Sequence, residues 1–313
     1  MSTPFISICI PAYKNTSYLE RLLDSITIQT YQDFEVIITD DSPDDSVFKM
    51  VENYQAKLPI TYYKNSPAAG MPANWNISIL RASGSWIKMM HDDDWFAKPT
   101  ALQQFADTAL RTSASFIFSA YTDVYAPSKK KIEHQLEGWK KEMLYSNSLN
   151  LFYLNVIGHP STIMHKKDVS ILYDEQFKWV VDIDFYIRFL QQYQGFEYID
   201  DAIINIGIDE NQVSNDCYKN PQVEIPEYFT LLSKFPSDLP LKYEYVFHLV
   251  WNLVIRFKIK SLDEIKRTGY EGRLPAGLQE IITYQKQIPR LILKQPKWSE
   301  KFMKKCFGKL ERV

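Results

Sequence analysis

The stretch FISICIPAYKNTSYLERLLDSITIQTYQDFEVIITDDS, residues 5–42, predicts a strand, a helix and a second strand in that order. Residues 5–10 form a short apolar run rich in β-branched side chains, as expected of a strand buried on both faces, and Pro11 is expected to end it. Apolar side chains then recur at helical spacing from Ser17 to Thr30, and Phe34–Thr39 predicts the second strand. This order is the beginning of a βαβ unit.

The alternation of strands and helices continues up to residue 91. The pattern predicts helices over 44–57 and Asn74–Ala82, and strands over 60–65 and 85–90. Strands that alternate with helices form βαβ units around a mostly parallel sheet. We therefore expect an α/β fold, with a Rossmann-like central sheet flanked by helices. In such sheets, ligands bind beyond the carboxyl ends of the strands.

The middle of the chain predicts more strands and one clear helix. Residues 116–125 and 197–208 are strand-like, and 182–193 form an amphipathic helix. Between them, 126–145 is charged and is expected to be a mobile connection.

The last third of the chain is predicted to be helical. From residue 217 the pattern turns helical, and Tyr243–Ile259 is its strongest helix candidate. We therefore predict a first domain over 1–215 and a helical C-terminal region over 216–313.

Composition restricts the class of protein and its compartment. Apolar residues make up 45% of the 313, which is enough for a core, and aromatic residues make up 14%. The aromatic side chains suit either an ordinary core or stacking on substrate rings. Cys9, Cys217 and Cys306 are far apart and lack metal-site spacing, so we expect no disulfide framework or structural zinc. With no signal peptide or membrane-spanning run, a cytoplasmic protein, soluble or peripherally attached, is expected.

Three polar clusters follow three of the predicted strands. They are Pro11-Ala12-Tyr13, Asp40-Asp41-Ser42 and Asp92-Asp93-Asp94. Because the carboxyl ends of parallel strands lie at one edge of a sheet, these clusters are expected to converge. This convergence is the first indication of a functional site.

The run Asp92–Asp94 suggests a metal site. Like charges packed together resist ionisation, and a divalent cation relieves that cost. Carboxylates acting with a phosphate-bearing ligand suit Mg²⁺ or Mn²⁺. The run could equally be a solvated turn or a helix N-cap, although the two aromatic residues after it favour the functional interpretation.

The turn at Asp41 suggests a nucleotide site. Its carboxylate could accept a hydrogen bond from a nucleobase N–H, on which the Tyr13 ring could stack. The alternative is a helix N-cap region. No GxGxxG or Gly-rich Walker loop is present, which argues against dinucleotide enzymes and P-loop NTPases.

Together these residues resemble the family 2 glycosyltransferases, which have a GT-A fold. The resemblance runs from about Ile6 to Ser214 and is strongest in the opening stretch. It implies an inverting, metal-dependent transfer of a sugar from a nucleotide-sugar to a hydroxyl of a glycan or lipid-linked glycan. Such enzymes commonly act in bacterial polysaccharide biosynthesis, for example of lipopolysaccharide or capsule. A UDP-sugar is the favoured donor, and thymine in a dTDP-sugar offers the same N–H.

The resemblance also implies a role for each matching residue. Pro11, Ala12 and Tyr13 would line the nucleotide pocket, Asp41 would contact the base, and Gly70 and Asn74 would approach the nucleotide and its sugar. Asp92, Asp93 and Asp94 would form the DxD element, with Asp92 and Asp93 on the nucleotide-sugar and Asp94 on Mn²⁺ or Mg²⁺. His91 is interpreted as a neighbour only.

Three further positions belong to the acceptor side or the metal by resemblance. WVVDIDFYIRFL, residues 179–190, is similar to the family's acceptor-side helix, where Asp182 matches the general base and Trp179 lies beside it. Val181 departs from the Glu usual there. Asp209 stands where the family commonly has His and is a second candidate metal ligand. His159 falls where the wall of the acceptor pocket is expected.

The C-terminal segment 286–313 is strongly basic. It carries nine Lys or Arg and two Glu, a charge of +7, so the rest of the chain carries −9 against a total of −2. A basic amphipathic helix with aromatic residues suits an anionic membrane surface. It also suits a solvated helix that packs one face on the protein. Nucleic acid is not expected, because the acidic remainder would repel phosphates.

Two other classes of function remain in view. Val181 and Asp209 leave open a catalytically silent module that binds a nucleotide-sugar or glycan on the same fold. A nucleotidyltransferase also uses an acidic metal site, but it usually begins with a Gly-rich basic loop, which PAYKNTSY lacks.

Overall fold

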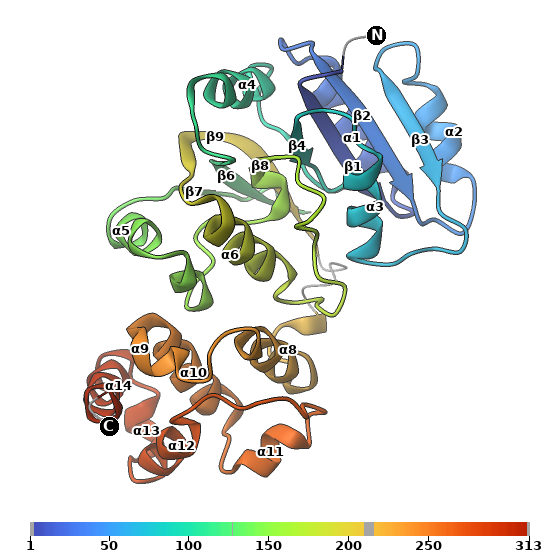
Figure 1. Cartoon of the computed structure of the whole chain (residues 1–313). Coiled ribbons are helices and arrows are strands. Elements are labelled where there is room, and N and C mark those ends of the chain that lie inside the picture. The colour runs from blue at the N-terminus through green and yellow to red at the C-terminus, as the bar shows by residue number, and fades with distance from the viewer. Residues whose placement is uncertain (1–2, 127, 210–215, 312–313) are drawn as a thin grey trace. The chain divides into compact units, whose positions relative to one another are not determined.

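The computed structural model describes residues 3–126, 128–209 and 216–311, and its chain forms two compact units. The first unit comprises 1–145, 156–176 and 184–212; the second comprises 146–155, 177–183 and 213–313 (Figure 1). Asp182 therefore belongs to the second unit. The domain boundary predicted near residue 215 stays a prediction.

The first unit alternates strands and helices, as the sequence predicts. Its elements are β1 (Ile6–Ala12), α1 (Thr16–Thr27), β2 (Phe34–Asp40), α2 (Ser46–Glu52), β3 (Ile60–Lys64), α3 (Ala73–Arg81), β4 (Trp86–Met89), β5 (Trp95–Phe96), α4 (Ala101–Arg111), β6 (Phe116–Tyr125), β7 (Lys131–His134), α5 (Trp139–Ser146), η2 (Pro160–Thr162), β8 (Ile163–Lys166), α6 (Val181–Tyr193) and β9 (Glu197–Ile208). Helix α6 has its first turn in the second unit and its remaining turns in the first.

These strands form one mixed, mainly parallel sheet. Its order is β3-β2-β1-β4-β8-β6-β9-β5, with β7 paired to β6. Strands β1 to β4 are mutually parallel, β8 runs antiparallel between β4 and β6, and β9 is parallel to β6. Strands β1 to β4, β6 and β9 therefore point the same way, and their carboxyl ends share an edge. The predicted α/β architecture is confirmed.

Helices cover both faces of the sheet. Ile6, Ile8 and Ile10 of β1 belong to the main apolar core together with buried side chains of α1, α2 and α4. Alternate residues of a strand face opposite ways, so Cys9 lies on the other face, where its thiol donates to the Ser78 carbonyl of α3. With both faces covered, the polar carboxyl edge is left as the place for a ligand.

Two predictions about elements of the first unit were wrong. Strand β1 does not end at Pro11 but continues to Ala12, paired with β2. Strand β4 pairs with β1 only as far as Cys9, so the last residues of β1 have a neighbouring strand on one side only. A proline, which has no N–H to donate, is tolerated at such a position. The connection over 126–145 contains β7 and α5. Strand β7 pairs antiparallel with the second half of β6, which β8 does not reach.

The second unit is helical. Its elements are η1 (Ser148–Phe152), α8 (Pro221–Ser233), α9 (Leu239–Lys242), α10 (Glu244–Phe257), α11 (Leu262–Lys266), α12 (Leu278–Lys286), α13 (Arg290–Leu293) and α14 (Pro296–Leu310). Helix α10 is apolar on most sides and lies at the centre, in contact with α9, α12 and α14. The Trp251 indole of α10 donates to the Ser299 hydroxyl of α14 at 3.0 Å.

The basic segment is two helices rather than one. Gln295 adopts an extended backbone between α13 and α14, because a residue that precedes a proline disfavours the helical region. Within the described part of the chain, no helix is long and apolar enough to cross a membrane.

Candidate functional site

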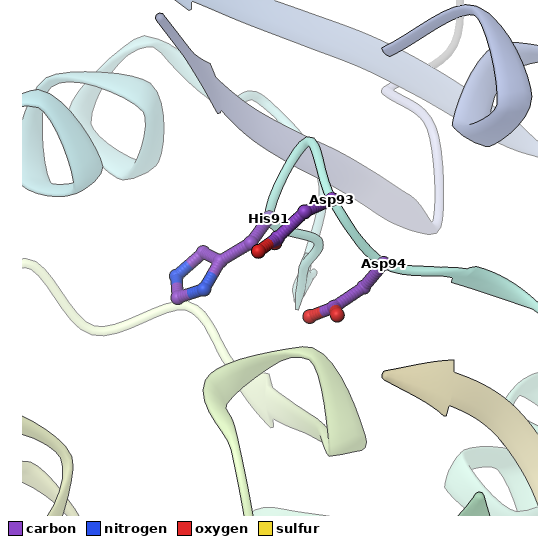
Figure 2. A group of neighbouring side chains, drawn as sticks. All are labelled: His91, Asp93 and Asp94. Carbon is purple, nitrogen blue, oxygen red and sulfur yellow. The ribbon is translucent and has the colours of Figure 1, made fainter. Parts of the chain in front are cut away.

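The acidic run forms a tight turn at the carboxyl end of β4. The Asp94 N–H donates to the His91 carbonyl at 3.1 Å, which folds the four residues back on themselves. The side chains of His91, Asp93 and Asp94 all extend from this turn (Figure 2). One potential ligand atom from each lies within 4.8 Å of the others. The structure thus brings a histidine and two carboxylates together.

Asp94 is the most enclosed member of this group. Its side chain is 2% exposed, and its carboxylate accepts hydrogen bonds from the Gly207 N–H at 3.0 Å and from the Ser161 hydroxyl. Burial, with Asp93 beside it, raises the pKa of Asp94 well above its ordinary value. A carboxylate buried next to a like charge is costly, and a bound cation would offset that cost.

Asp92 connects the ends of β1 and β4. Its carboxylate accepts a hydrogen bond from the Tyr13 N–H at 3.1 Å. Burial, with Asp93 adding to it, raises the pKa of Asp92 to about 7. The Tyr13 side chain is 54% exposed, so its ring is available to stack on a planar ligand. Two of the predicted polar clusters therefore meet at this edge.

His91 belongs to the candidate metal group, although the sequence interpretation left it outside. Burial lowers the pKa of His91 to about 4, so the ring is neutral at physiological pH. Its Nε2 atom is buried and has no hydrogen-bond partner within the described residues. A neutral imidazole nitrogen beside two carboxylates is a donor set that can hold a divalent cation. The residues present therefore fit a Mn²⁺ or Mg²⁺ ion.

Two residues that the sequence interpretation missed hold this turn in place. The Arg21 guanidinium donates to the Asp93 carbonyl at 2.6 Å and lies 3.7 Å from the centre of the Trp95 ring. At Gly207 a Cβ atom would lie 2.4 Å from the Asp93 carbonyl oxygen, so no larger residue fits there. A glycine inside a strand often marks such a close approach, and that signal could have identified Gly207.

A lysine is buried beneath the same turn. Lys88 of β4 is fully buried, and its ammonium lies 4.9 Å from the centre of the Phe105 ring. It donates to the carbonyls of Met89, at 3.1 Å, and of Ser161. Burial lowers the pKa of Lys88 well below its ordinary value, and the Asp94 charge opposes that shift. The charged residue within the apolar run WIKMM was the sequence signal for this feature.

Asp41 organises the loop that follows β3. One carboxylate oxygen accepts from the Asn65 side chain at 2.7 Å and from the Ala69 N–H at 3.0 Å; the other accepts from the Gly70 N–H at 2.7 Å. The Asn65 amide also donates to the Asn74 side chain at 2.9 Å. The structure thus brings Asp41, Gly70 and Asn74 together, through an Asn65 that the sequence interpretation missed.

The remaining predicted residues of the first unit lie around this edge. Pro11 and Ala12 end β1, and the Ala12 carbonyl accepts from the Asp41 N–H at 3.0 Å. The Asp209 carboxylate accepts from the Tyr18 hydroxyl at 2.6 Å and is not part of the candidate metal group. The residues that follow it in GIDENQVS, 210–214, lie outside the described residues.

His159 lies close enough to the acidic turn to interact with it. Its ring packs edge-on against Tyr121, with 5.6 Å between ring centroids. Burial lowers the pKa of His159, while the charges of Asp123 and Asp93 oppose that shift. A role at the acceptor wall stays a prediction.

Asp182 and Trp179 belong to the second unit. The Asp182 carboxylate accepts from the Asn155 amide at 2.7 Å, and burial raises the pKa of Asp182 to about 6. The Glu227 carboxylate accepts from the backbone N–H groups of Lys178, Trp179 and Val180, which fixes the segment before α6. A carboxylate with this pKa is suited to remove a proton near neutral pH.

Comparison with known protein families and relatives agrees with this geometry. The model of the family described as glycosyl transferase family 2 matches residues 7–171, more than half of the chain. An uncharacterised glycosyltransferase of Rickettsia typhi is 25% identical over 76% of this chain and 73% of its own length. The poly(ribitol-phosphate) β-N-acetylglucosaminyltransferase TarS of Staphylococcus aureus is 29% identical over 38% of this chain; the match spans 20% of TarS.

Solved structures show the same fold. A S. aureus TarS fragment in complex with UDP-GlcNAc superimposes with a TM-score of 0.62 at 17% identity, covering 98% of this chain and 90% of the fragment. The mannosyltransferase PcManGT of Pyrobaculum calidifontis, in complex with GDP-Man and Mn²⁺, gives a TM-score of 0.59 at 12% identity, covering 100% of this chain and 88% of that one. The fold is therefore GT-A, and the chain belongs to glycosyl transferase family 2 and is a glycosyltransferase.

Proposed function

We propose that this glycosyltransferase moves a sugar from a nucleotide-sugar to a hydroxyl of a glycan or lipid-linked glycan, with inversion at the anomeric carbon, in bacterial polysaccharide biosynthesis. The observation that carries the proposal is the group His91, Asp93 and Asp94, at the same sheet edge as Tyr13 and Asp41. A cluster of cation ligands beside an exposed ring and a loop-binding carboxylate suits a nucleoside diphosphate linked to a sugar.

The residues of this chain would divide the work. Tyr13 and Asp41 would bind the nucleoside, and Asp92 the ribose and sugar. Asp94, with His91 and Asp93, would hold Mn²⁺ or Mg²⁺, which would stabilise charge on the departing diphosphate. Asp182 would take the proton from the acceptor hydroxyl as that oxygen attacks the anomeric carbon. A single displacement of this kind inverts the configuration.

The hydrogen bonds of Asp41 leave room for a nucleobase N–H. A carboxylate has about four lone-pair sites, and Asn65, Ala69 and Gly70 occupy three of them. One lone-pair site remains for the N–H of uracil. Thymine has the same N–H group. Among the structural relatives, TarS was solved with UDP-GlcNAc and PcManGT with GDP-Man and Mn²⁺. We propose UDP-sugars as donors, with dTDP-sugars next.

A thermal-shift screen tests the donor and the metal together. With UDP-GlcNAc at about 100 times its Kd, binding adds about 2.7 kcal/mol to the free energy of unfolding, and the Tm should rise by about 5 °C. The rise should need Mn²⁺ or Mg²⁺ and be smaller for GDP-Man. Asp94→Asn should lose the metal-dependent part. A metal-independent shift, or none with any nucleotide-sugar, would refute the proposal.

We also propose that the basic helices of the second unit contact an anionic membrane surface from the cytoplasmic side. Helix α14 buries Ser299, Met303 and Cys306, so one face packs on the protein as the alternative interpretation of this segment required. Leu291 and Trp298 are nevertheless 79% and 53% exposed. Around them are exposed basic residues: Arg290, Lys294, Lys297, Lys301 and Lys305. Apolar anchors among cations suit a membrane interface.

Vesicle sedimentation tests this membrane contact. Full-length protein should bind phosphatidylglycerol-containing vesicles and not pure phosphatidylcholine. The double variant Leu291→Ser, Trp298→Ser should bind at least about 100-fold more weakly, since each buried apolar side chain contributes about 1.5–3 kcal/mol and about 1.4 kcal/mol is a factor of ten. Leu110→Ser, which removes a leucine 67% exposed on α4 of the first unit, is the matched control and should bind like wild type. Equal binding by all three proteins would exclude this surface.

A further inference from the structure

Ser161 contacts two members of the candidate metal group. Its hydroxyl oxygen accepts a hydrogen bond from the His91 N–H at 2.9 Å and donates its proton to the Asp94 carboxylate. The side chain is fully buried in the short helix η2, far along the chain from the turn it contacts. A single hydroxyl therefore fixes both the start of the turn and the carboxylate at its end.

Lys88 fixes Ser161 in turn. Its ammonium donates to the Ser161 carbonyl and to the Met89 carbonyl, which joins η2 to the end of β4. The Asp94 charge favours the protonated form of Lys88. On its other sides the ammonium faces the rings of Phe96 and Phe105. Lys88 thus combines two backbone contacts with a countercharge beneath the turn.

We propose that Lys88 and Ser161 are positioning residues that hold His91 and Asp94 in the geometry that binds the divalent cation. The inference rests on the metal site of the proposed function. Groups that hydrogen-bond to metal ligands orient them, and their loss commonly weakens metal binding by about 10- to 100-fold. Ser161 is such a group for Asp94, and Lys88 stands behind Ser161.

The variant Lys88→Met separates a role in metal binding from a role in stability alone. It leaves the carbonyls of Met89 and Ser161 without the hydrogen bonds of the lysine, and the buried Asp94 without its countercharge, so the Tm should fall. A role in stability alone predicts an unchanged Mn²⁺ affinity in the folded variant, measured below its Tm. If the lysine serves the metal ligands, cation binding should weaken in that folded variant.

Electron paramagnetic resonance of free Mn²⁺ measures the metal affinity directly. The full chain is titrated with Mn²⁺ in the presence of UDP, and the Tm of each variant is recorded. Ser161→Ala and Lys88→Met should bind Mn²⁺ about 10- to 100-fold more weakly than wild type. Ser119→Ala is the matched control. Ser119 is equally buried, and its hydroxyl has no hydrogen-bond partner within the described residues, so this variant should bind like wild type.

The outcomes separate this inference from the proposed function. Mn²⁺ affinities within twofold of wild type in Ser161→Ala and Lys88→Met, with Asp94→Asn still losing the ion, would overturn the inference and leave the metal site standing. A wild-type protein that holds no Mn²⁺ in the presence of UDP would overturn both. Weaker Mn²⁺ binding in Lys88→Met and Ser161→Ala, measured below the Tm of each variant, supports the positioning role.

Discussion

Asp94→Asn should lower kcat/KM for sugar transfer by about 10³-fold. A divalent cation contributes several kcal/mol by stabilising charge on a departing phosphate oxygen, and each 1.36 kcal/mol is a factor of ten in rate. Asparagine keeps an oxygen that can accept from the Gly207 N–H and the Ser161 hydroxyl, so the change removes charge with little change of shape. Release of UDP, measured over a series of Mn²⁺ concentrations, gives the effect.

The stability of this variant should move the other way. Burial raises the pKa of Asp94 above its unfolded value, so the ionised carboxylate costs the metal-free fold stability as pH rises through that pKa. Asparagine removes this cost, and the Tm at pH 7 without metal should be unchanged or higher. Asp201→Asn, which breaks an exposed pair with Lys98, should stay within about twofold of wild-type activity. Metal-dependent turnover that survives in Asp94→Asn would contradict the assignment.

The strands and helices of the sheet could be predicted because the pattern that specifies each of them lies within a short segment of sequence. Strands β1 and β2 are short, largely apolar runs, and helix α1 between them repeats apolar residues at helical spacing. The ends of the elements were harder to predict. Pro11 can lie within β1 because β4 ends before it and requires no N–H from that position. Strand β7 was missed because its alternating residues Lys131 to His134 gain their pairing only from β6, a partner the local pattern does not reveal.

The site was only partly predictable for the same reason. That Tyr13, Asp41 and Asp92 follow parallel strands is readable from the order of elements. The contacts that support them are long-range: Ser161 is 70 residues from His91, and Gly207 is 113 from Asp94. Sequence order does not reveal which hydroxyl or N–H meets a given carboxylate. His91 was underestimated because only the folded turn reveals that its Nε2 has no hydrogen-bond partner among the residues that the structure describes.

Asp182 presents a separate problem, because the part proposed for it in the reaction is a proton transfer and not binding. Burial raises its pKa to about 6, and the hydrogen bond from the Asn155 amide opposes that rise by stabilising the carboxylate. A general base acts in its ionised form, so kcat should be low below pH 6, increase as pH rises through about 6, and level off above it. Because the pKa of Asp92 lies nearby, at about 7, variants of Asp182 and of its partner Asn155 are needed to assign the rise in kcat to this residue.

Asp182→Asn should lower kcat by about 10²–10⁴-fold, the usual contribution of a general base, with little change in the KM of the donor. The limb of the pH profile near 6 should disappear with it. Asn155→Ala is the matched variant: removing a donor to the carboxylate favours the protonated form, so the pKa of Asp182 rises and the limb moves to higher pH while the plateau is kept. Proton NMR of the product reads the anomeric configuration in the same samples. A limb that persists in Asp182→Asn, or does not move in Asn155→Ala, would assign the base to another residue.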